Sequence, residues 1–185
     1  MNMLNDLPAG EEPPQRINAV IEVESGTRDK YEYDGEHGVF VLDRILYSSV
    51  MFPFDYGFVP RTWQDDGDPL DVMVLGFEPL SIGCVIRVRP VAVLVMDDEK
   101  GEDAKVLAVI EKDPRFADVK DVTDVQPHTL KEVQEFFETY KRLEPGKWAK
   151  FERWGNAEEA RGIVTRAMEL YKTREGKENK KALVL

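Results

Sequence analysis

The sequence of 185 residues contains one cysteine, Cys84, and two histidines, His37 and His128. A single cysteine excludes an intramolecular disulfide, a cysteine-rich zinc site and a cysteine-ligated iron–sulfur cluster. Two histidines are too few for a metal centre that is built from several imidazoles. Any chemistry must therefore depend on carboxylates, lysines, arginines and tyrosines.

Long apolar runs are also missing from the chain. The longest extends from Val91 to Met96, far below the roughly 20 residues that a membrane-spanning helix needs. Residues 1–16 are polar and have none of the features of a signal or transit peptide. We therefore expect no membrane partner and a cytoplasmic location.

Positive charge is scarce relative to negative charge. The chain has 25 Lys and Arg residues against 36 Asp and Glu, a formal net charge of −11, so we expect no nucleic-acid partner. Hydrophobic residues make up 42% of the chain, enough for one packed core. The length predicts a single domain over residues 1–185, with flexible ends at residues 1–14 and 173–185.

Strand-like patterns dominate the chain from Ile17 to Glu111. Apolar residues alternate with others in the first run, which predicts that Glu22 lies on the face opposite the core, and Lys30 and Glu32 share one face of the next. Many short strands with few helices between them favour an antiparallel barrel or sandwich. The runs are residues 17–24, Asp29–Asp34, Val39–Leu42, Asp71–Leu75, Cys84–Met96 and Lys105–Glu111.

Helical patterns come late in the chain. Thr129 and Glu132 match a capping box, and apolar residues follow at helical spacing up to Leu143. A second helix is predicted to begin at Asn156, with Glu159 three residues later. Strands followed by two main helices predict an α+β fold that is mainly β, whereas residues 112–128 match no regular pattern.

The most informative segment is Asp66-Gly-Asp-Pro-Leu-Asp71. Its three carboxylates repel one another, and its glycine and proline allow a sharp turn on which Asp66, Asp68 and Asp71 can converge. Carboxylates without nearby His or Cys suit a hard cation such as Mg²⁺ or Mn²⁺. A solvated acidic turn is the alternative, but the apolar residues on both sides favour a turn that lies against the core.

A second acidic segment, Asp97 to Lys105, lies between two strand-like runs and is predicted to be a hairpin loop. Charged hairpin tips are usually only solvated, so this segment matters if Asp98 and Asp103 reach the first cluster. Two acidic sets around one cavity could hold two or more metal ions. Candidate partners for an anion are Lys30, Arg44, Lys105, Lys141, Lys147, Tyr56 and Tyr140, each of which could instead be a surface cation or a core tyrosine.

From about Ile21 to Asn156 the chain resembles the soluble family I inorganic pyrophosphatases. The resemblance rests on seven landmarks in the family's order, of which the acidic segment Asp66 to Val72 is the signature. The other six are Ile-Glu22-Val, Lys30-Tyr-Glu32, Asp43-Arg44, Asp55-Tyr56-Gly57, the run from Asp98 to Lys105, and Phe-Phe-Glu-Thr-Tyr140-Lys141 with Gly-Lys147-Trp148.

This resemblance implies a five-stranded, distorted barrel of the OB type with two main helices packed outside. It also implies hydrolysis of pyrophosphate to two phosphates, dependent on several Mg²⁺ ions, with Mn²⁺ as a substitute, by direct attack of a metal-bridged water. The expected general base is Asp68. The expected metal ligands are Asp66, Asp71, Asp98, Asp103 and Glu32; the phosphate-binding residues are Lys30, Arg44, Tyr56, Lys105, Tyr140 and Lys141; Glu22 and Lys147 are supporting positions. The resemblance further implies a homo-oligomer, a hexamer as in bacterial relatives.

The chain departs from the family pattern at Phe52, where the family usually has a second active-site tyrosine. The missing hydroxyl removes a hydrogen bond that is typically worth about 0.5–1.5 kcal/mol. Two other functions stay open from the residues alone. One is a non-catalytic barrel that binds single strands or oligosaccharides, and the other is a metal-dependent phosphohydrolase that acts on nucleotides or sugar phosphates.

Overall fold

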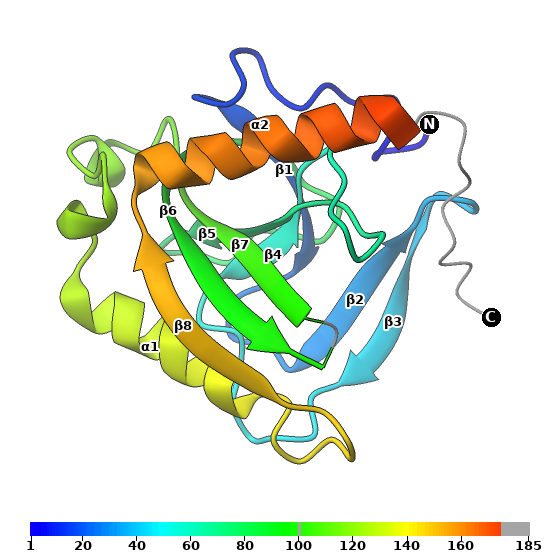
Figure 1. Ribbon diagram of the computed structural model, residues 1–185, viewed down its shortest axis with the longest axis vertical. Coiled ribbons are helices and arrows are strands. Elements are labelled where there is room, and N and C mark those ends of the chain that lie inside the picture. The colour runs from blue at the N-terminus through cyan, green and yellow to red at the C-terminus, as the bar shows by residue number, and fades with distance from the viewer. Residues whose placement is uncertain (100, 175–185) are drawn as a thin grey trace.

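The computed structural model describes residues 1–99 and 101–174 (Figure 1). Strands come first in this part of the chain, and its two α-helices come late. In chain order the elements are β1 (Ile17–Val23), β2 (Asp29–Asp34), β3 (Val39–Ile45), β4 (Asp55–Phe58), β5 (Asp71–Leu75), β6 (Val85–Asp98), β7 (Gly101–Ile110), the 3-10 helices η1 (Pro114–Phe116) and η2 (Val122–Asp124), α1 (Pro127–Thr139), β8 (Ala149–Gly155) and α2 (Ala157–Arg174).

Five strands close into a ring in the order β1-β4-β5-β7-β6, and β6 pairs again with β1. Strand β6 closes the ring because it is 14 residues long and changes partners along its length. Its first part pairs with β1, with Val88 opposite Ile17, and its second part pairs with β8, with Val93 opposite Gly155. The distorted five-stranded barrel of the OB type is confirmed.

One pairing in the ring differs from the antiparallel arrangement that the sequence predicted. Strands β5 and β7 run parallel, with Val72 opposite Val106. A parallel neighbour requires a crossover connection, and the long β6 strand lies between the two in sequence. Asp71 and Lys105 each stand one residue before that pair, so this register makes them neighbours across the two strands.

The ring also requires a close approach of two backbones at β1 and β4. Gly57 lies opposite Ile21, and a Cβ atom on Gly57 would stand 1.8 Å from the carbonyl oxygen of Val20. No side chain fits there, which explains the glycine directly after Tyr56.

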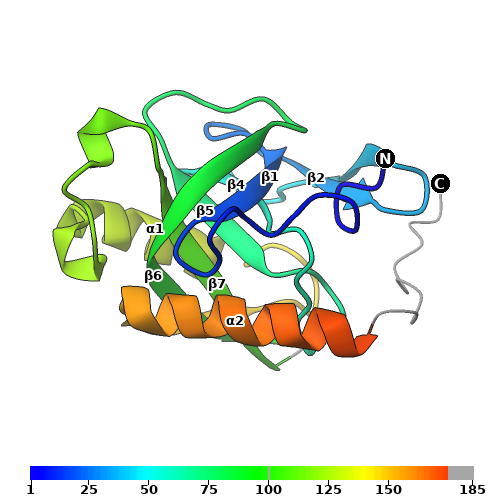
Figure 2. The ribbon, with the colours of Figure 1, turned by 90° about the horizontal axis from the view of Figure 1, so that it is seen from above.

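Both faces of the central strands are buried. On β5, Val72 and Val74 belong to a core cluster that includes Val164 and Ala167 of α2. Met73 on the same strand belongs to a second cluster with residues of α1. The two helices therefore lie outside the ring (Figures 1 and 2), as predicted.

The structure confirms one of the two predicted helix starts and corrects the other. Asn156 caps α2, because its side chain accepts a hydrogen bond from Glu159 N at 2.9 Å, and the Glu159 carboxylate accepts one from Asn156 N at 3.3 Å. This capping box is confirmed. The one predicted at Thr129 is wrong, because α1 already begins at Pro127, where Gln126 caps the amide of His128 at 2.8 Å. Proline at the first helical position favours this earlier start.

Other predictions have mixed outcomes. Strands β4 and β8 were not predicted, and residues 112–128 contain η1 and η2. Helix α2 continues through Arg174, so residues 173 and 174 of the predicted flexible end are helical. The rest of that end, residues 175–185, lies outside the described residues. Residues 1–14, expected to be a flexible end, pack against the core with Leu4 and Ala9 buried. None of the helices in the described ranges is long and apolar enough to cross a bilayer.

Strands β2 and β3 form a hairpin of their own. They pair with each other, with Lys30 opposite Arg44 and Asp34 opposite Val39, and among the described residues they pair with no other strand. The hairpin projects from the ring on the side of the molecule toward which α2 ends (Figure 1).

Candidate active site

The acidic loop, residues 64–71, connects the region after β4 to the start of β5. It turns at Gly67, whose φ of +93° suits glycine. The turn is held by hydrogen bonds from Gln64 N to Asp68 O at 2.8 Å and from Asp68 N to Asp66 Oδ1 at 3.0 Å. Leu70 is fully buried, so the loop lies against the core as its apolar flanks predicted.

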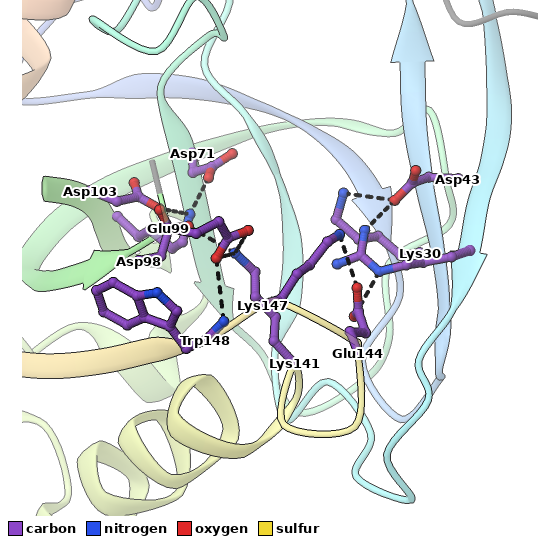
Figure 3. Close-up of polar contacts among 12 residues, drawn as sticks. Lys30, Asp43, Asp71, Asp98, Glu99, Asp103, Lys141, Glu144, Lys147 and Trp148 are labelled. Carbon is purple, nitrogen blue, oxygen red and sulfur yellow. Dashed lines mark hydrogen bonds and ion pairs between the residues drawn. The ribbon is translucent and has the colours of Figure 1, made fainter. Parts of the chain in front are cut away.

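Lys105 joins the acidic loop to the hairpin of β6 and β7. Its ammonium pairs with Asp71 and lies 2.8 Å from Asp103; Figure 3 labels both carboxylates. Burial by itself lowers the pKa of Lys105, but Asp103 and Asp71 raise it well above its ordinary value. Burial raises the pKa of Asp71, yet Lys105 holds it below its ordinary value. Both groups are therefore charged at neutral pH.

Lys141 pairs with the carboxylates at the tip of the β6–β7 hairpin, on the β6 side. It follows α1 directly, and its ammonium lies 2.8 Å from Asp98 and 3.3 Å from Glu99. Glu99 also accepts a hydrogen bond from Trp148 N at 3.4 Å (Figure 3). The acidic segment is thus the hairpin tip that the sequence predicted, and it is packed against cations.

The β2–β3 hairpin supplies a third group of charges. Lys30 pairs with Glu32 and lies 3.5 Å from Asp43, which also pairs with Arg44. Arg44 Nε lies 3.0 Å from Glu144 Oε1. Lys147 lies 2.9 Å from Oε2 of the same carboxylate (Figure 3). The Lys30–Glu32 pair confirms that these two residues share a face.

These three groups surround one cleft of about 740 Å³, called here the acidic cleft. All fourteen residues that the sequence predicted for the site line it: Glu22, Lys30, Glu32, Arg44, Tyr56, Asp66, Asp68, Asp71, Asp98, Asp103, Lys105, Tyr140, Lys141 and Lys147.

Some residues at the cleft were not predicted for the site. Asp43 and Glu99 line it, and both were visible in sequence as neighbours of selected charges. Gln64 also lines it, and its side chain donates to Ala104 O at 3.1 Å, which ties the acidic loop to β7. Glu144 joins Arg44 to Lys147, and no spacing in the sequence indicates this role.

Two tyrosines and one glutamate in the cleft have pKa values raised by burial. Burial raises the pKa of Tyr56 well above its ordinary value, and the Asp71 carboxylate adds to the effect. Burial likewise raises the pKa of Tyr140. Both phenols therefore keep their protons at neutral pH and can donate hydrogen bonds. Burial raises the pKa of Glu22 to about 8, although Tyr33 N donates to its carboxylate at 2.7 Å.

The donor chemistry of the acidic cleft fits hard divalent cations. Among the described residues that line it, eleven are acidic and six are basic, and none is His or Cys. An excess of oxygen donors of this kind suits Mg²⁺ or Mn²⁺. No three such groups in the described ranges converge closely enough to enclose an ion by themselves, because lysines stand between the carboxylates. Ion binding would therefore have to part these lysine–carboxylate pairs.

Phe52 lies behind the cleft rather than in it. It is 2% exposed, and its ring packs 4.6 Å from that of Phe136 and 5.8 Å from that of Tyr56. Because Tyr56 lines the cleft and Phe52 does not, the departure from the family pattern lies in an aromatic cluster one layer away from the charges.

Known proteins resemble this chain over most of its length. The family model described as inorganic pyrophosphatase matches residues 19–172. The inorganic pyrophosphatase of Halobacterium salinarum is 48% identical over 170 residues, which cover 92% of this chain and 96% of that protein. That of Sulfolobus acidocaldarius is 46% identical over 164 residues, which cover 88% of this chain and 95% of that protein.

The fold agrees with these sequence relationships. The crystal structure of the inorganic pyrophosphatase from Thermus thermophilus superposes with a TM-score of 0.90 at 44% identity, covering 93% of this chain and 99% of that one. Fold, sequence and the charged cleft thus lead to one family. This chain belongs to the family I inorganic pyrophosphatases, enzymes that hydrolyse pyrophosphate.

Proposed function

We propose that this chain catalyses the Mg²⁺-dependent hydrolysis of pyrophosphate to two phosphates by direct attack of water, with Mn²⁺ as an alternative ion. The observation that carries the proposal is the acidic cleft itself, where excess carboxylates, lysines and buried tyrosines meet in one space. Pyrophosphate is a small, highly charged anion, and it needs cations and hydrogen-bond donors on all its oxygens.

The proposed ligands of the divalent ions are Asp66, Asp71, Asp98, Asp103 and Glu32. When bound there, such ions neutralise phosphate oxygens and lower the pKa of water toward neutrality. The carboxylates come from the acidic loop, from both strands of the β6–β7 hairpin and from β2. They therefore approach the cleft from several sides, as ions that bridge a substrate require.

Asp68 is the proposed general base. Its loop is held by the turn at Gly67 and by the bond from Gln64 N to Asp68 O, so the carboxylate has a defined place from which to accept a proton. Direct attack by water is supported by the composition of the cleft wall, because no Ser, Thr, Cys or His lies among its described residues. A phosphoenzyme would need such a nucleophile or a carboxylate that is not engaged otherwise.

The proposed phosphate-binding groups are Lys30, Arg44, Tyr56, Lys105, Tyr140 and Lys141. The cations are paired with carboxylates, so they are charged and lie at the cleft. Lys141 and Tyr140 are the proposed donors to the departing phosphate, where positioning and electrostatics supply most of the catalysis. Glu22 and Lys147 support the site, Lys147 through its pair with Glu144.

A comparison of substrates tests this function. Phosphate release is measured with Mg²⁺ from pyrophosphate, ATP and a sugar phosphate. We expect rapid release from pyrophosphate and little from the other two. Faster release from ATP or the sugar phosphate would favour the other phosphohydrolase function. No release together with a gel shift of single-stranded DNA would favour the binding barrel.

The variant Asp68→Asn tests the proposed base. Turnover should fall by about 10²–10⁴-fold, the usual contribution of a general base, while Mg²⁺ affinity measured by calorimetry stays close to that of the wild type. The matched control is Asp65→Asn, because Asp65 is 70% exposed and pairs with Arg166 at the rim. A near-normal rate for Asp68→Asn would remove this residue from the role.

We also propose that the chain forms a homo-oligomer, a hexamer as the family resemblance implies, in the cytoplasm. Exposed large hydrophobic side chains such as Tyr47, Met51 and Leu143 support an assembly. Light scattering on the purified protein measures its mass directly, and a monomer at micromolar concentration would contradict the assembly. Cell fractionation tests the location.

A further inference from the structure

The segment Met1–Asp6, called here the N-terminal strap, lies against the β2–β3 hairpin near its tip (Figure 2) and reaches the last turn of α2 through a side-chain hydrogen bond. Two of its hydrogen bonds go to the hairpin and one goes to α2. Asn2 Nδ2 donates to Gly35 O at the hairpin tip at 2.6 Å. Met3 N donates to the hydroxyl of Tyr33 at 2.9 Å. Tyr171 of α2 donates to Asn5 Oδ1 at 2.9 Å.

The strap is also anchored in the core. Leu4 is 4% exposed and packs in a cluster with Val20, Phe58 and Trp63. Its carbonyl accepts a hydrogen bond from Arg61 N at 2.9 Å. Leu4 is one of the residues that line the acidic cleft, so the strap is both fixed to the ring and part of the cleft wall.

The hairpin that the strap holds also packs on the ring, through Tyr33 and Phe40 against the cluster of Val20 and Phe58. It is a separate two-stranded sheet, and a two-stranded sheet alone has little stability of its own. Its links to the ring include the bond from Tyr33 N to Glu22 at 2.7 Å and the packing of the Tyr33 ring 5.7 Å from that of Phe58. The strap adds bonds at Tyr33 and Gly35, close to the tip.

The same hairpin carries Lys30 and Arg44, which stand opposite each other across it and line the acidic cleft. A movement of the hairpin relative to the ring would move these two cations away from the carboxylates of the acidic loop. Asp71, Asp98 and Asp103 would stay in place, because they belong to strands of the ring, whereas Glu32 on β2 would move with the two cations.

We infer that Asn2 is a positioning residue for substrate binding: it ties the strap to the hairpin tip and so keeps Lys30 and Arg44 in the cleft. Asn2 suits this role because the nitrogen and the oxygen of its side-chain amide bind different groups. Its amide nitrogen holds Gly35 O, and its amide oxygen accepts from Leu4 N and Asn5 N, both at 3.0 Å, which forms the turn of the strap. The inference rests on the proposed phosphate-binding role of Lys30 and Arg44.

The test compares Asn2→Ser with Asn18→Ser. Serine keeps a short oxygen acceptor for the turn at position 2 but cannot reach Gly35. Asn18 makes the same kind of bond, from its side-chain amide to Pro8 O at 2.9 Å, at a place remote from the hairpin. A third variant, Asn2→Ala, removes the turn acceptor as well.

We expect KM for pyrophosphate to rise about two- to tenfold in Asn2→Ser, the factor that corresponds to one lost hydrogen bond, and at least as much in Asn2→Ala. The turnover number should change less than KM, because Asp68 and four of the five proposed metal ligands lie outside the β2–β3 hairpin. Amide hydrogen exchange of β2 and β3 should become faster by a similar factor, with the ring strands unchanged. Asn18→Ser should match the wild type in both measurements.

Unchanged exchange and unchanged KM in both Asn2 variants would overturn the inference, and so would an equal rise in KM for Asn18→Ser. The exchange measurement needs no catalysis. If the wild type did not hydrolyse pyrophosphate while exchange rose only in the Asn2 variants, the proposed function would fail and the tether would stand, with its role in substrate binding withdrawn.

Discussion

The ammonium of Lys105 lies 2.8 Å from the carboxylate of Asp103, two residues earlier on the same face of β7. The same ammonium pairs with Asp71 on the parallel neighbour β5. One buried lysine therefore holds together two carboxylates that belong to different acidic segments of the chain.

Replacement of Lys105 by glutamine should destabilise the metal-free protein. The change leaves two carboxylates without their shared cation at a buried position, which typically costs about 3–5 kcal/mol. Urea unfolding in a chelating buffer measures the loss. The control is Lys150→Gln, since Lys150 is 68% exposed and such surface pairs contribute about 0–1 kcal/mol. Added Mg²⁺ should raise the unfolding midpoint of Lys105→Gln more than that of the wild type, and equal shifts would contradict this account.

Glu22 should make stability depend on pH. Burial raises its pKa from 4.5 to about 8, so the folded chain keeps a proton that the unfolded chain releases above about pH 4.5. The free energy of unfolding should therefore fall between pH 4.5 and 8. Glu22→Gln keeps an oxygen acceptor for Tyr33 N and should flatten this slope, with a gain of about 1–3 kcal/mol at pH 7. Chelated protein is unfolded in urea across the pH range, and an unchanged slope would show that Glu22 is ionised when folded.

Phe52→Tyr should match or exceed the turnover of the wild type. Phe52 packs against Tyr56, which lines the cleft, so a hydroxyl at this position restores the family's usual residue next to a site group. The control is Phe54→Tyr: Phe54 is 1% exposed and packs between Phe136 and Phe137. A hydroxyl buried there without a partner should lower stability by about 1–3 kcal/mol and leave KM unchanged. A sharp loss of turnover in Phe52→Tyr would show that the pocket is arranged differently.

Replacement of Gln64 by leucine should lower the turnover number, because Gln64 ties the acidic loop to β7. Its side chain donates to Ala104 O at 3.1 Å, the carbonyl that stands between Asp103 and Lys105 in sequence. Gln64→Leu keeps a similar volume but loses this bond, so the loop that carries Asp66 and Asp68 is no longer tied to β7. We expect turnover to fall about ten- to a hundredfold, since small displacements at a reacting centre have effects of this size.

The control for this variant is Gln134→Leu on α1, whose side chain bonds Glu138 at 3.4 Å along the helix. Thermal unfolding should be similar in the two variants. Full activity in Gln64→Leu would show that the loop holds its place through its backbone bonds alone.

The sequence predicted the features of this fold that depend only on residues close together in the chain. The bounds of β2 and β5 follow from runs between turn residues, and the start of α2 follows from the reciprocal bonds of Asn156 and Glu159. The start of α1 was misjudged because Pro127 sets the backbone two residues before the Thr129 pattern. The short strand β4 was missed, since Asp55 and Gly57 are both typical of turns and their strand exists through pairing with β1 and β5.

The amino-acid sequence by itself determined which chemical groups this protein has and the order in which they occur: acidic segments, lysines and tyrosines, with almost no thiol or imidazole. Only the tertiary structure decided their partners. The parallel register of β5 and β7 puts Lys105 between Asp71 and Asp103, and the end of α1 brings Lys141 to Asp98. Pairs of this kind, and the raised pKa of Glu22, depend on burial and on strands far apart in the chain, which no spacing along the sequence encodes.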